Sequence, residues 1–295
     1  MKLSILIVSY NQEKYIAECL DSILIQKIPF EFEIIVADDN STDSTLSIII
    51  EKLINTKLNY RILATESNLG IVRNYQRAFQ ECKGNYIAVM EGDDYWTDPY
   101  RVKKHVEFLE NHLEFVMSFN RMIVFNETKG SFVLSEWVLN DDYEYITAKQ
   151  LASGNKIGNL SACVFRNSEI KKLNAKIFEI PIADWMLGMA LGQYGLIAKL
   201  KDVMSVYRVN SNGEWSKMSV EEQNNAVVKL IDVYNKFLDN KYDDEFNEYK
   251  NSIINQANSK RVSTSLVDYI PPILLLILKL ILPLELRRLR KRVFK

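Results

Sequence analysis

The sequence predicts an α/β protein with a Rossmann-like, mostly parallel central sheet flanked by helices. Over the first 125 residues, short apolar runs alternate with helix patterns of about a dozen residues, which is typical of βαβ units. The apolar runs are nearly continuous, as expected for strands that are covered on both faces. Polar and acidic residues follow several of these runs, at the sheet edge where open parallel sheets bind ligands.

Strand and helix patterns alternate from the start of the sequence. Strands are expected at residues 2–9, 32–37, 60–64 and 86–90. The first two helices show apolar stripes from Ile16 to Leu24 and from Leu46 to Leu53, and a third helix is expected at residues 71–82. A fourth helix is expected to start with Pro99 at its first position, because the missing N–H of proline costs nothing there.

The second half of the sequence is more mixed. Further elements are expected as strands at 115–125, 160–165 and 197–207, helices at 183–191 and 220–258, and an irregular loop or hairpin at 126–145. No internal repeat or low-complexity linker occurs before about residue 260. The pattern therefore predicts one large α/β domain followed by a helical extension.

Composition and charge exclude several classes of protein. Hydrophobic residues make up 47% and charged residues 25% of the chain, as in folded globular proteins. The formal net charge of −1 gives no reason to expect nucleic acid as a partner. Cys19, Cys82 and Cys163 are far apart without a CxxC pair, which indicates buried thiols in a reducing cytoplasm rather than disulfides or a zinc site. The N-terminal segment lacks the features of a signal peptide.

Five carboxylates follow two of the predicted strands. Asp38 and Asp39 come after the second strand, and Glu91, Asp93 and Asp94 come after the fourth. We expect these two strand ends to be adjacent, and crowded carboxylates repel one another unless a cation lies among them. Mg²⁺ and Mn²⁺ prefer oxygen ligands and bridge readily to phosphates. The sequence therefore predicts a metal-held diphosphate ligand, although acidic residues at strand ends also serve as turn and cap residues.

Two familiar nucleotide-binding motifs are absent from the sequence. No GxGxxG follows the first predicted strand, which disfavours a dinucleotide-binding fold. No GxxxxGK[ST] loop occurs either, which disfavours a P-loop enzyme. The phosphate-binding chemistry is therefore expected to come from the acidic segments and a cation.

Four motifs in order resemble those of the family 2 glycosyltransferases of GT-A fold. They are Ser4 to Asn11, Val36 to Asp43, Asn68-Leu69-Gly70 with Arg73-Asn74, and Glu91-Gly92-Asp93-Asp94. The resemblance is dense over residues 3–105 and weaker but ordered to about residue 216. It implies an inverting, Mn²⁺- or Mg²⁺-dependent transfer of a sugar from a nucleoside-diphosphate sugar, in the first place a UDP-sugar.

The resemblance also implies roles for residues of the donor site. Tyr10 and Asp39 match the contacts to the nucleoside base, and Arg73 matches a basic position that contacts the nucleotide. Asp93 matches the carboxylate for the ribose or the metal, and Asp94 matches the metal ligand.

Two positions depart from the pattern of the family. Glu91 stands where the family more often has Asp, and Asn210 stands where many relatives have His. These departures leave the metal roles of Glu91 and Asn210 open. They also allow an alternative from another class, a non-catalytic partner that binds sugar nucleotides or glycans within an assembly complex. Nucleotidyl transfer is a second enzymatic alternative.

The acceptor side rests on two further matches. Asp184, within Ala183-Asp184-Trp185, resembles the acidic residue that acts as general base, and its alternative role is a helix N-cap. Residues 206–216 resemble a loop that closes over the donor diphosphate, where Arg208 is expected to neutralise phosphate charge and Trp215 to contact the donor. The acceptor implied is a glycan or a lipid-linked glycan; the sequence does not specify the sugar or the linkage.

Three domains are expected. Residues 1–216 form a catalytic domain, with a nucleotide-binding half at 1–110 and an acceptor half at 111–216. A helical extension follows at 217–262, and an apolar and basic tail at 263–295.

The C-terminal tail differs in charge from the rest of the chain. Residues 279–295 carry a net charge of +6, against −7 for the other residues. The apolar run from Ile273 to Leu282 is too short for a confident membrane span. The tail is expected to hold the protein peripherally on the anionic inner face of the cell membrane. Packing on the catalytic domain, or a homodimer interface, is the alternative.

Overall fold

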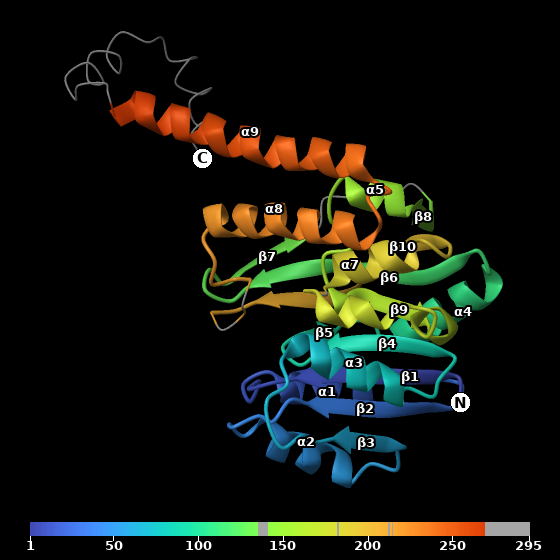
Figure 1. The fold of residues 1–295 in the computed structure, drawn as a ribbon. Coiled ribbons are helices and arrows are strands. Elements are labelled where there is room, and N and C mark those ends of the chain that lie inside the picture. The colour runs from blue at the N-terminus through green and yellow to red at the C-terminus, as the bar shows by residue number, and fades with distance from the viewer. Residues whose placement is uncertain (135–140, 182, 212, 214, 269–295) are drawn as a thin grey trace. The chain divides into compact units, whose positions relative to one another are not determined.

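The computed structural model describes residues 1–134, 141–181, 183–211, 213 and 215–268 (Figure 1). The chain divides into two compact units, Met1–Tyr249 and Lys250–Lys295. Helix α9 (Asp243–Asp268) begins in the first unit and supplies the described part of the second. No boundary between compact units falls at residue 216, because α8 (Val220–Phe237) and the first turns of α9 belong to the first unit.

The first half of the sheet is entirely parallel. Its strands are β1 (Leu3–Ser9), β2 (Phe32–Asp38), β3 (Tyr60–Leu63) and β4 (Tyr86–Glu91), in the spatial order β3-β2-β1-β4 (Figure 1). In the central strand, Ile7 pairs with Val36 of β2 on one side and with Met90 of β4 on the other. The chain thus winds outward from β1 in both directions, so the carboxyl end of β1 is a topological switch point, where open α/β sheets bind ligands.

The remaining strands extend this sheet with mixed pairing. They are β5 (Tyr95–Trp96), β6 (Phe115–Asn126), β7 (Ser131–Leu134), β8 (Tyr143–Ile146), β9 (Cys163–Arg166) and β10 (Leu196–Val209). Strand β9 lies antiparallel between β4 and β6, and β10 lies parallel to β6. The short strands β5 and β8 pair with β10, and β7 pairs with β6. This mixed α/β sheet with flanking helices is the predicted fold class.

The helices of the first unit cover both faces of the sheet. Besides α8 and the start of α9 they are α1 (Ile16–Leu24), α2 (Thr45–Ile54), α3 (Ile71–Glu81), α4 (Arg101–Asn111), α5 (Ala148–Ala152), α6 (Asn167–Ile170) and α7 (Asp184–Leu191), with 3₁₀ turns η1 (Leu160–Ala162) and η2 (Ala175–Glu179). One apolar core joins α1, α2 and α4 to alternate residues of β1, β2 and β4. Because side chains alternate along a strand, the other residues of β1 point to the opposite face, and there Phe79 of α3 meets Phe165 edge-to-face.

The structure corrects three expectations about the elements. Helix α4 begins at Arg101 rather than at Pro99, because the Asp98 side chain accepts the Tyr100 N–H and holds these residues in a turn. Residues 160–162 form η1 rather than the start of a strand. The helical segment expected at 220–258 is interrupted between α8 and α9, where Asp239 and Asn240 have φ values of 54° and 57°.

A fourth correction concerns the acidic strand ends. The ends of β2 and β4 were expected to be adjacent, but β1 lies between these two strands. After β3 the chain crosses back over the sheet and adds β4 on the other side of β1. The spacing of apolar residues in the sequence does not reveal this change in the direction of strand addition. Asp38 and Asp39 therefore do not join Glu91, Asp93 and Asp94 in one cluster.

All three cysteines are free and buried, as the sequence predicts. Among the described residues, no helix has both the length and the apolar character needed to cross a membrane.

A buried cluster of hydrogen-bonded polar side chains joins α4 to β6. The Asn120 side-chain oxygen accepts the Arg101 Nε–H at 2.8 Å and lies 3.2 Å from His105 Nε2. The other ring nitrogen of His105 lies 2.8 Å from the Ser118 hydroxyl. Since Asn120 Oδ1 can only accept, His105 must be protonated on Nε2 and accept from Ser118 on Nδ1. Burial lowers the pKa of His105 well below its usual value, and the Arg101 charge lowers it further.

This buried histidine predicts a loss of stability in mild acid. The unfolded chain takes up a proton at His105 as the pH falls below about 6.5, whereas the folded protein does not. The free energy of unfolding should therefore fall by up to about 1.4 kcal/mol per pH unit from this residue alone. In His105→Gln, the dependence of this free energy on pH between 7 and 5, measured by urea unfolding, should be smaller. As a control, Val102→Ala in the same helix should lower stability at every pH with the wild-type slope; an unchanged slope in His105→Gln would contradict the prediction.

Candidate active site

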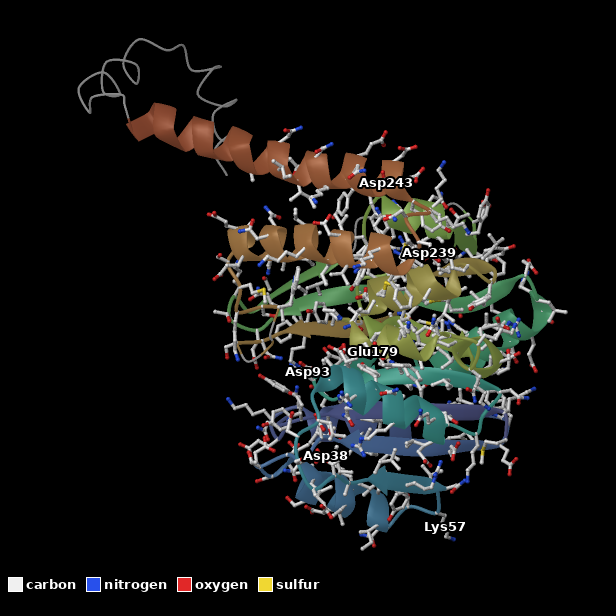
Figure 2. The ribbon with its side chains drawn as sticks, in the orientation of Figure 1. Asp38, Lys57, Asp93, Glu179, Asp239 and Asp243 are labelled. Carbon is white, nitrogen blue, oxygen red and sulfur yellow. The ribbon has the colours of Figure 1, made fainter. Side chains whose placement is uncertain are left out.

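Polar loops meet at the sheet edge where the parallel strands end, and Figure 2 shows Asp38 and Asp93 at this edge. The loops after β1 and β2 are joined by backbone and side-chain hydrogen bonds. The Asn11 side chain accepts the Thr42 N–H at 2.8 Å, and the Ser41 hydroxyl accepts the Asn11 N–H at 2.9 Å. Asn11 itself has a φ of 52°, a conformation that asparagine tolerates better than most residues. These bonds hold the two loops together beside Tyr10.

Asp38 is a structural residue of the loop after β2. Its Oδ1 accepts the hydroxyls of Ser41 at 2.6 Å and Ser9 at 3.1 Å, and its Oδ2 accepts the Ser41 N–H at 2.9 Å. The side chain is almost completely buried. This is the turn-forming role that acidic residues at strand ends often have.

Asp39 orients the loop that precedes α3. Its two carboxylate oxygens accept the backbone N–H groups of Leu69 and Gly70, each at 2.9 Å. Gly70 has a φ of 81°, which a residue with a side chain adopts only under strain. Asp39 is 2% exposed, so it faces the predicted nucleoside pocket mainly through the loop that it holds.

Three predicted donor residues are exposed. Tyr10 and Trp215 are 43% and 42% exposed, and Arg73 is an exposed residue in the first turns of α3. Arg77, one helical turn later, lies inward and donates to the backbone carbonyls of Asp38 and Leu63 at 2.8 and 2.9 Å. The helix therefore carries one arginine that ties strand ends together and one that faces solvent.

The acidic segment Glu91 to Asp94 forms the end of β4 and the turn before β5. Asp94 is 1% exposed; its Oδ2 accepts the Ser161 hydroxyl at 2.6 Å and the Asn159 amide at 3.0 Å, and its Oδ1 accepts the Arg208 N–H at 2.8 Å. Burial and the charge of Asp93 raise the pKa of Asp94 to about 7, against these hydrogen bonds, which lower it. Asp94 thus holds the segment in place.

Glu91 and Asp93 are less enclosed than Asp94. Glu91 accepts the Tyr75 hydroxyl at 3.1 Å, and Asp93 Oδ2 accepts the Asn210 amide at 2.9 Å. Burial raises the pKa of both carboxyls, and the charges of Asp94 and Asp93 raise that of Glu91 further. Desolvated carboxylates this close are stabilised by a cation.

The donor set fits a divalent cation that is shared with a ligand. Carboxylate oxygens are suitable ligands for Mn²⁺ or Mg²⁺. In the part of the chain that the structure describes, no three His, Cys, Asp or Glu side chains converge as a metal-binding group. Such a cation would therefore need oxygens from a phosphate or water to complete its coordination, as Mg²⁺ usually does.

Ser161 connects the acidic segment to the second half of the sheet. Its hydroxyl donates to Asp94 and accepts the Glu91 N–H at 3.0 Å. Its carbonyl accepts the Trp96 indole N–H at 2.9 Å and an Arg101 N–H at 3.0 Å. The residue is fully buried in η1. Neither Ser161 nor Asn159 was identified from the sequence, because a serine or asparagine before a strand is common in loops.

The Arg208 guanidinium lies between aromatic rings and acidic partners. It is 4.8 Å from the centroid of the Tyr15 ring, 5.4 Å from that of Tyr95 and 5.6 Å from that of Phe125. It donates to Glu18 at 2.5 Å and to the Asp93 carbonyl at 2.9 Å. Arg208 thus lies next to the acidic segment and is paired with Glu18; its contact with a diphosphate stays a prediction.

Asp184, the predicted general base, is the first residue of α7. The N-cap of α7 is Ala183, and no side-chain capping bond is present. Asp184 Oδ2 accepts the Asn155 amide at 2.8 Å. Burial raises the pKa of Asp184 against this and other hydrogen bonds, which lower it.

The segment from Asn155 to Ser161 contacts both Asp184 and the acidic segment. Asn155 Nδ2 donates to Asp184 at 2.8 Å, and the Asn159 amide and the Ser161 hydroxyl donate to Asp94 at 3.0 and 2.6 Å. One short segment therefore links two carboxylates that are about 90 positions apart in the sequence. Burial raises the pKa of Tyr207, and the charges of these carboxylates raise it further.

The fold and this arrangement of acidic segment and separate carboxylate define a GT-A glycosyltransferase scaffold. The model of the family described as "Glycosyl transferase family 2" matches residues 4–173. The chain belongs to this family.

The chain is also similar to individual proteins. The uncharacterized protein Rv1520 of Mycobacterium tuberculosis is 34% identical over 216 residues, which is 72% of this chain and 60% of that protein. TarS of Staphylococcus aureus, a poly(ribitol-phosphate) β-N-acetylglucosaminyltransferase, is 39% identical over 116 residues, 38% of this chain and 19% of TarS. The chain thus spans less than two thirds of the length of these relatives.

Solved structures share the fold. TarS 1–349 in complex with UDP-GlcNAc has a TM-score of 0.58 at 22% identity, covering 78% of this chain and 66% of TarS 1–349. A mannosyltransferase from Pyrobaculum calidifontis in complex with GDP-Man and Mn²⁺ has a TM-score of 0.58 at 14% identity, covering 78% of this chain and 62% of that one.

The position of Ser161 predicts a large effect of a small substitution. Ser161→Ala removes the hydroxyl that donates to Asp94 and accepts from Glu91, and should lower the free energy of unfolding by about 1–3 kcal/mol. Urea unfolding measures this loss. The control Ser153→Ala changes an exposed serine in a nearby loop and should stay within about 0.5 kcal/mol of wild type. Equal stabilities of the two variants would show that the Ser161 hydroxyl contributes nothing.

Proposed function

We propose that this protein is an inverting, metal-dependent glycosyltransferase that moves a sugar from a nucleoside-diphosphate sugar to a hydroxyl of a glycan or lipid-linked glycan. The observation that carries the proposal is the segment from Asn155 to Ser161, which donates hydrogen bonds both to Asp184 and to Asp94 of the acidic segment. Transfer needs a site for the diphosphate and a base for the acceptor hydroxyl on opposite sides of the sugar. The two groups of carboxylates supply these functions.

The donor is proposed to lie over the carboxyl ends of β1, β2 and β4. Tyr10 is exposed there and is suited to stack on a nucleoside base. Asp39 holds the loop at Leu69 and Gly70 and supplies the second face of the base pocket. Arg73 and Trp215 are exposed and available to the nucleotide and to the loop over the diphosphate. UDP is the proposed nucleotide; TarS, a family member, has been crystallised with UDP-GlcNAc.

Asp93 and Asp94 are proposed to form the metal site, with different roles. Asp93 is less buried and accepts the Asn210 amide on Oδ2, so it is the proposed ligand of Mn²⁺ or Mg²⁺. Asp94 accepts three hydrogen bonds and is the proposed anchor of the segment. A bound divalent cation would neutralise charge on the departing diphosphate.

Arg208 is proposed to add positive charge beside the diphosphate. To reach a phosphate oxygen, its guanidinium would have to give up its bond to Glu18. Glu18 is 55% exposed in its side chain, so solvent can take over its hydrogen bonds at little cost. The aromatic rings around Arg208 would keep the guanidinium close to the acidic segment during this exchange.

Asp184 is proposed to take the proton of the acceptor hydroxyl. The acceptor oxygen forms a bond to the anomeric carbon while the bond from that carbon to the diphosphate oxygen breaks. One displacement at carbon inverts the anomeric configuration. Because an alcohol is a poor nucleophile at neutral pH, a base placed beside it contributes about 10²–10⁴-fold to the rate.

The assay for this proposal measures transfer and binding separately. UDP-, GDP- and dTDP-sugars are screened for Mn²⁺-dependent binding and slow hydrolysis, and the donor found is used with glycan acceptors. Asp184→Asn should bind the donor with wild-type affinity while transfer falls by about 10²-fold or more. Near-normal transfer by Asp184→Asn would exclude Asp184 as the base. Donor binding without hydrolysis or transfer by the wild type would favour a non-catalytic sugar-nucleotide-binding protein.

We also propose that the C-terminal tail binds an anionic membrane surface. Residues 269–295 lie outside the described residues, so this proposal rests on the sequence. The apolar run Ile273 to Leu282 is followed by six basic residues between Arg287 and Lys295, a combination typical of interfacial attachment. This would place the enzyme at the inner face of the membrane, where lipid-linked acceptors are found.

Deletion of residues 266–295 tests the membrane proposal. The shortened protein should no longer sediment with vesicles that contain anionic lipid, because both its apolar run and its basic cluster are lost. Wild-type protein with vesicles of neutral lipid is the control and should bind more weakly. Equal sedimentation of the full-length and shortened proteins would contradict membrane attachment through the tail.

A further inference from the structure

The loop between α5 and η1 passes directly beside Asp184. Within it, Asn155 Nδ2 donates to Asp184 Oδ2 at 2.8 Å. The oxygen of the same amide accepts the backbone N–H groups of Ile157 at 3.0 Å and Gly158 at 3.3 Å. One side chain therefore folds its own loop and contacts the carboxylate.

The surroundings fix the orientation of the Asn155 amide. Its oxygen can only accept, and it faces two backbone donors; its nitrogen can only donate, and it faces a carboxylate. A flipped amide would place the nitrogen against N–H groups and the oxygen against Asp184, losing all three bonds. The direction of the bond to Asp184 thus follows from the fold of the loop.

The loop and the helix are held to one another through α5. The Trp185 indole N–H, from the residue after Asp184, donates to the Leu151 carbonyl of α5 at 2.7 Å. Thr147 and Gln150 form a capping box that fixes the start of α5. Gly154 has a φ of 135° and leaves no spare space, since an added Cβ would lie 3.3 Å from the Tyr249 ring. The segments that carry Asn155 and Asp184 are therefore connected through α5.

We propose that Asn155 is a positioning residue that holds the Asp184 carboxylate in the orientation needed to take the proton of the acceptor hydroxyl. This inference rests on the proposed function of Asp184 as base. Asn155 acts through Asp184 and does not itself touch the reacting atoms. A carboxylate at a helix start can rotate about its χ angles, and a hydrogen bond from a fixed donor selects one rotamer.

The electrostatics of Asp184 provide a readout that a purely structural role would not affect. Burial raises the pKa of Asp184, and the bond from Asn155 opposes this by favouring the charged form. The titratable groups that face Asp184 from the surrounding elements are Glu91 of β4, Cys163 of β9, Tyr207 of β10 and Tyr234 of α8. None of these groups is a cation that could replace the hydrogen bond from Asn155. Removal of Asn155 should therefore raise the pKa of Asp184. The base would then become protonated, and activity would be lost, at a higher pH than in the wild type.

The experiment compares Asn155→Ala and Asn155→Asp with the control Ser153→Ala. Asn155→Ala should lower kcat about tenfold, the effect of losing one hydrogen bond to a charged group, with the KM for the donor within about twofold of wild type. The acid limb of its pH–rate profile should move to higher pH. Asn155→Asp keeps the oxygen that folds the loop but replaces the donor with a negative charge, so it should move the limb further. Ser153→Ala, exposed in the same loop, should match wild type.

A second measurement does not depend on activity. The titration of the Asp184 carboxyl is followed by ¹³C NMR, with Asp184→Asn to assign its signal, and should move to higher pH in Asn155→Ala. If both the profile and the titration are unchanged in both variants, Asn155 does not position Asp184, whatever the wild type transfers. If the titration moves but the wild type transfers no sugar, the contact stands while the proposed function fails.

Discussion

The acidic segment of this protein depends on one buried hydrogen-bonding residue, Ser161. Its hydroxyl and backbone together bind Asp94, Glu91, Trp96 and Arg101. A carboxylate as buried as Asp94 would be costly without such donors. With them, the turn after β4 is fixed to η1 and so to the second half of the sheet. The position of the acidic segment relative to the loop that contacts Asp184 follows from this connection.

Buried polar residues orient the loops of the candidate site, and the residues proposed to contact a ligand are exposed. The carboxylate oxygens of Asp38 and Asp39 accept hydrogen bonds from neighbouring hydroxyl and backbone N–H groups. Tyr10, Arg73 and Trp215, the residues proposed to contact the donor, are exposed. Loops that are already ordered by their own hydrogen bonds would lower the conformational cost of binding the proposed donor.

An aromatic cluster packs against the residue that follows the proposed base. Trp185, the residue after Asp184, packs edge-to-face against Tyr234 of α8 at 5.4 Å, and against Phe246 of α9 at 6.2 Å, between ring centroids. The Tyr234 hydroxyl donates to the Pro181 carbonyl at 3.0 Å, just before α7. Helix α8 and the first turn of α9 therefore pack against α7 within the first compact unit.

The sequence by itself determined the α/β class, most strand positions and the acidic residues at strand ends, because the period of apolar residues and the residues that end a strand are local properties. It did not reveal that β1 separates β2 from β4, since strand order depends on the direction of each crossover. It assigned Asp94 to the metal and Asp93 to the ribose or the metal, but only the tertiary structure shows that Asp94 is enclosed by three hydrogen-bond donors and that Asp93 is less buried. Asn155, Asn159 and Ser161 are common loop residues in the sequence, and only folding brings each within hydrogen-bonding distance of a carboxylate far along the chain.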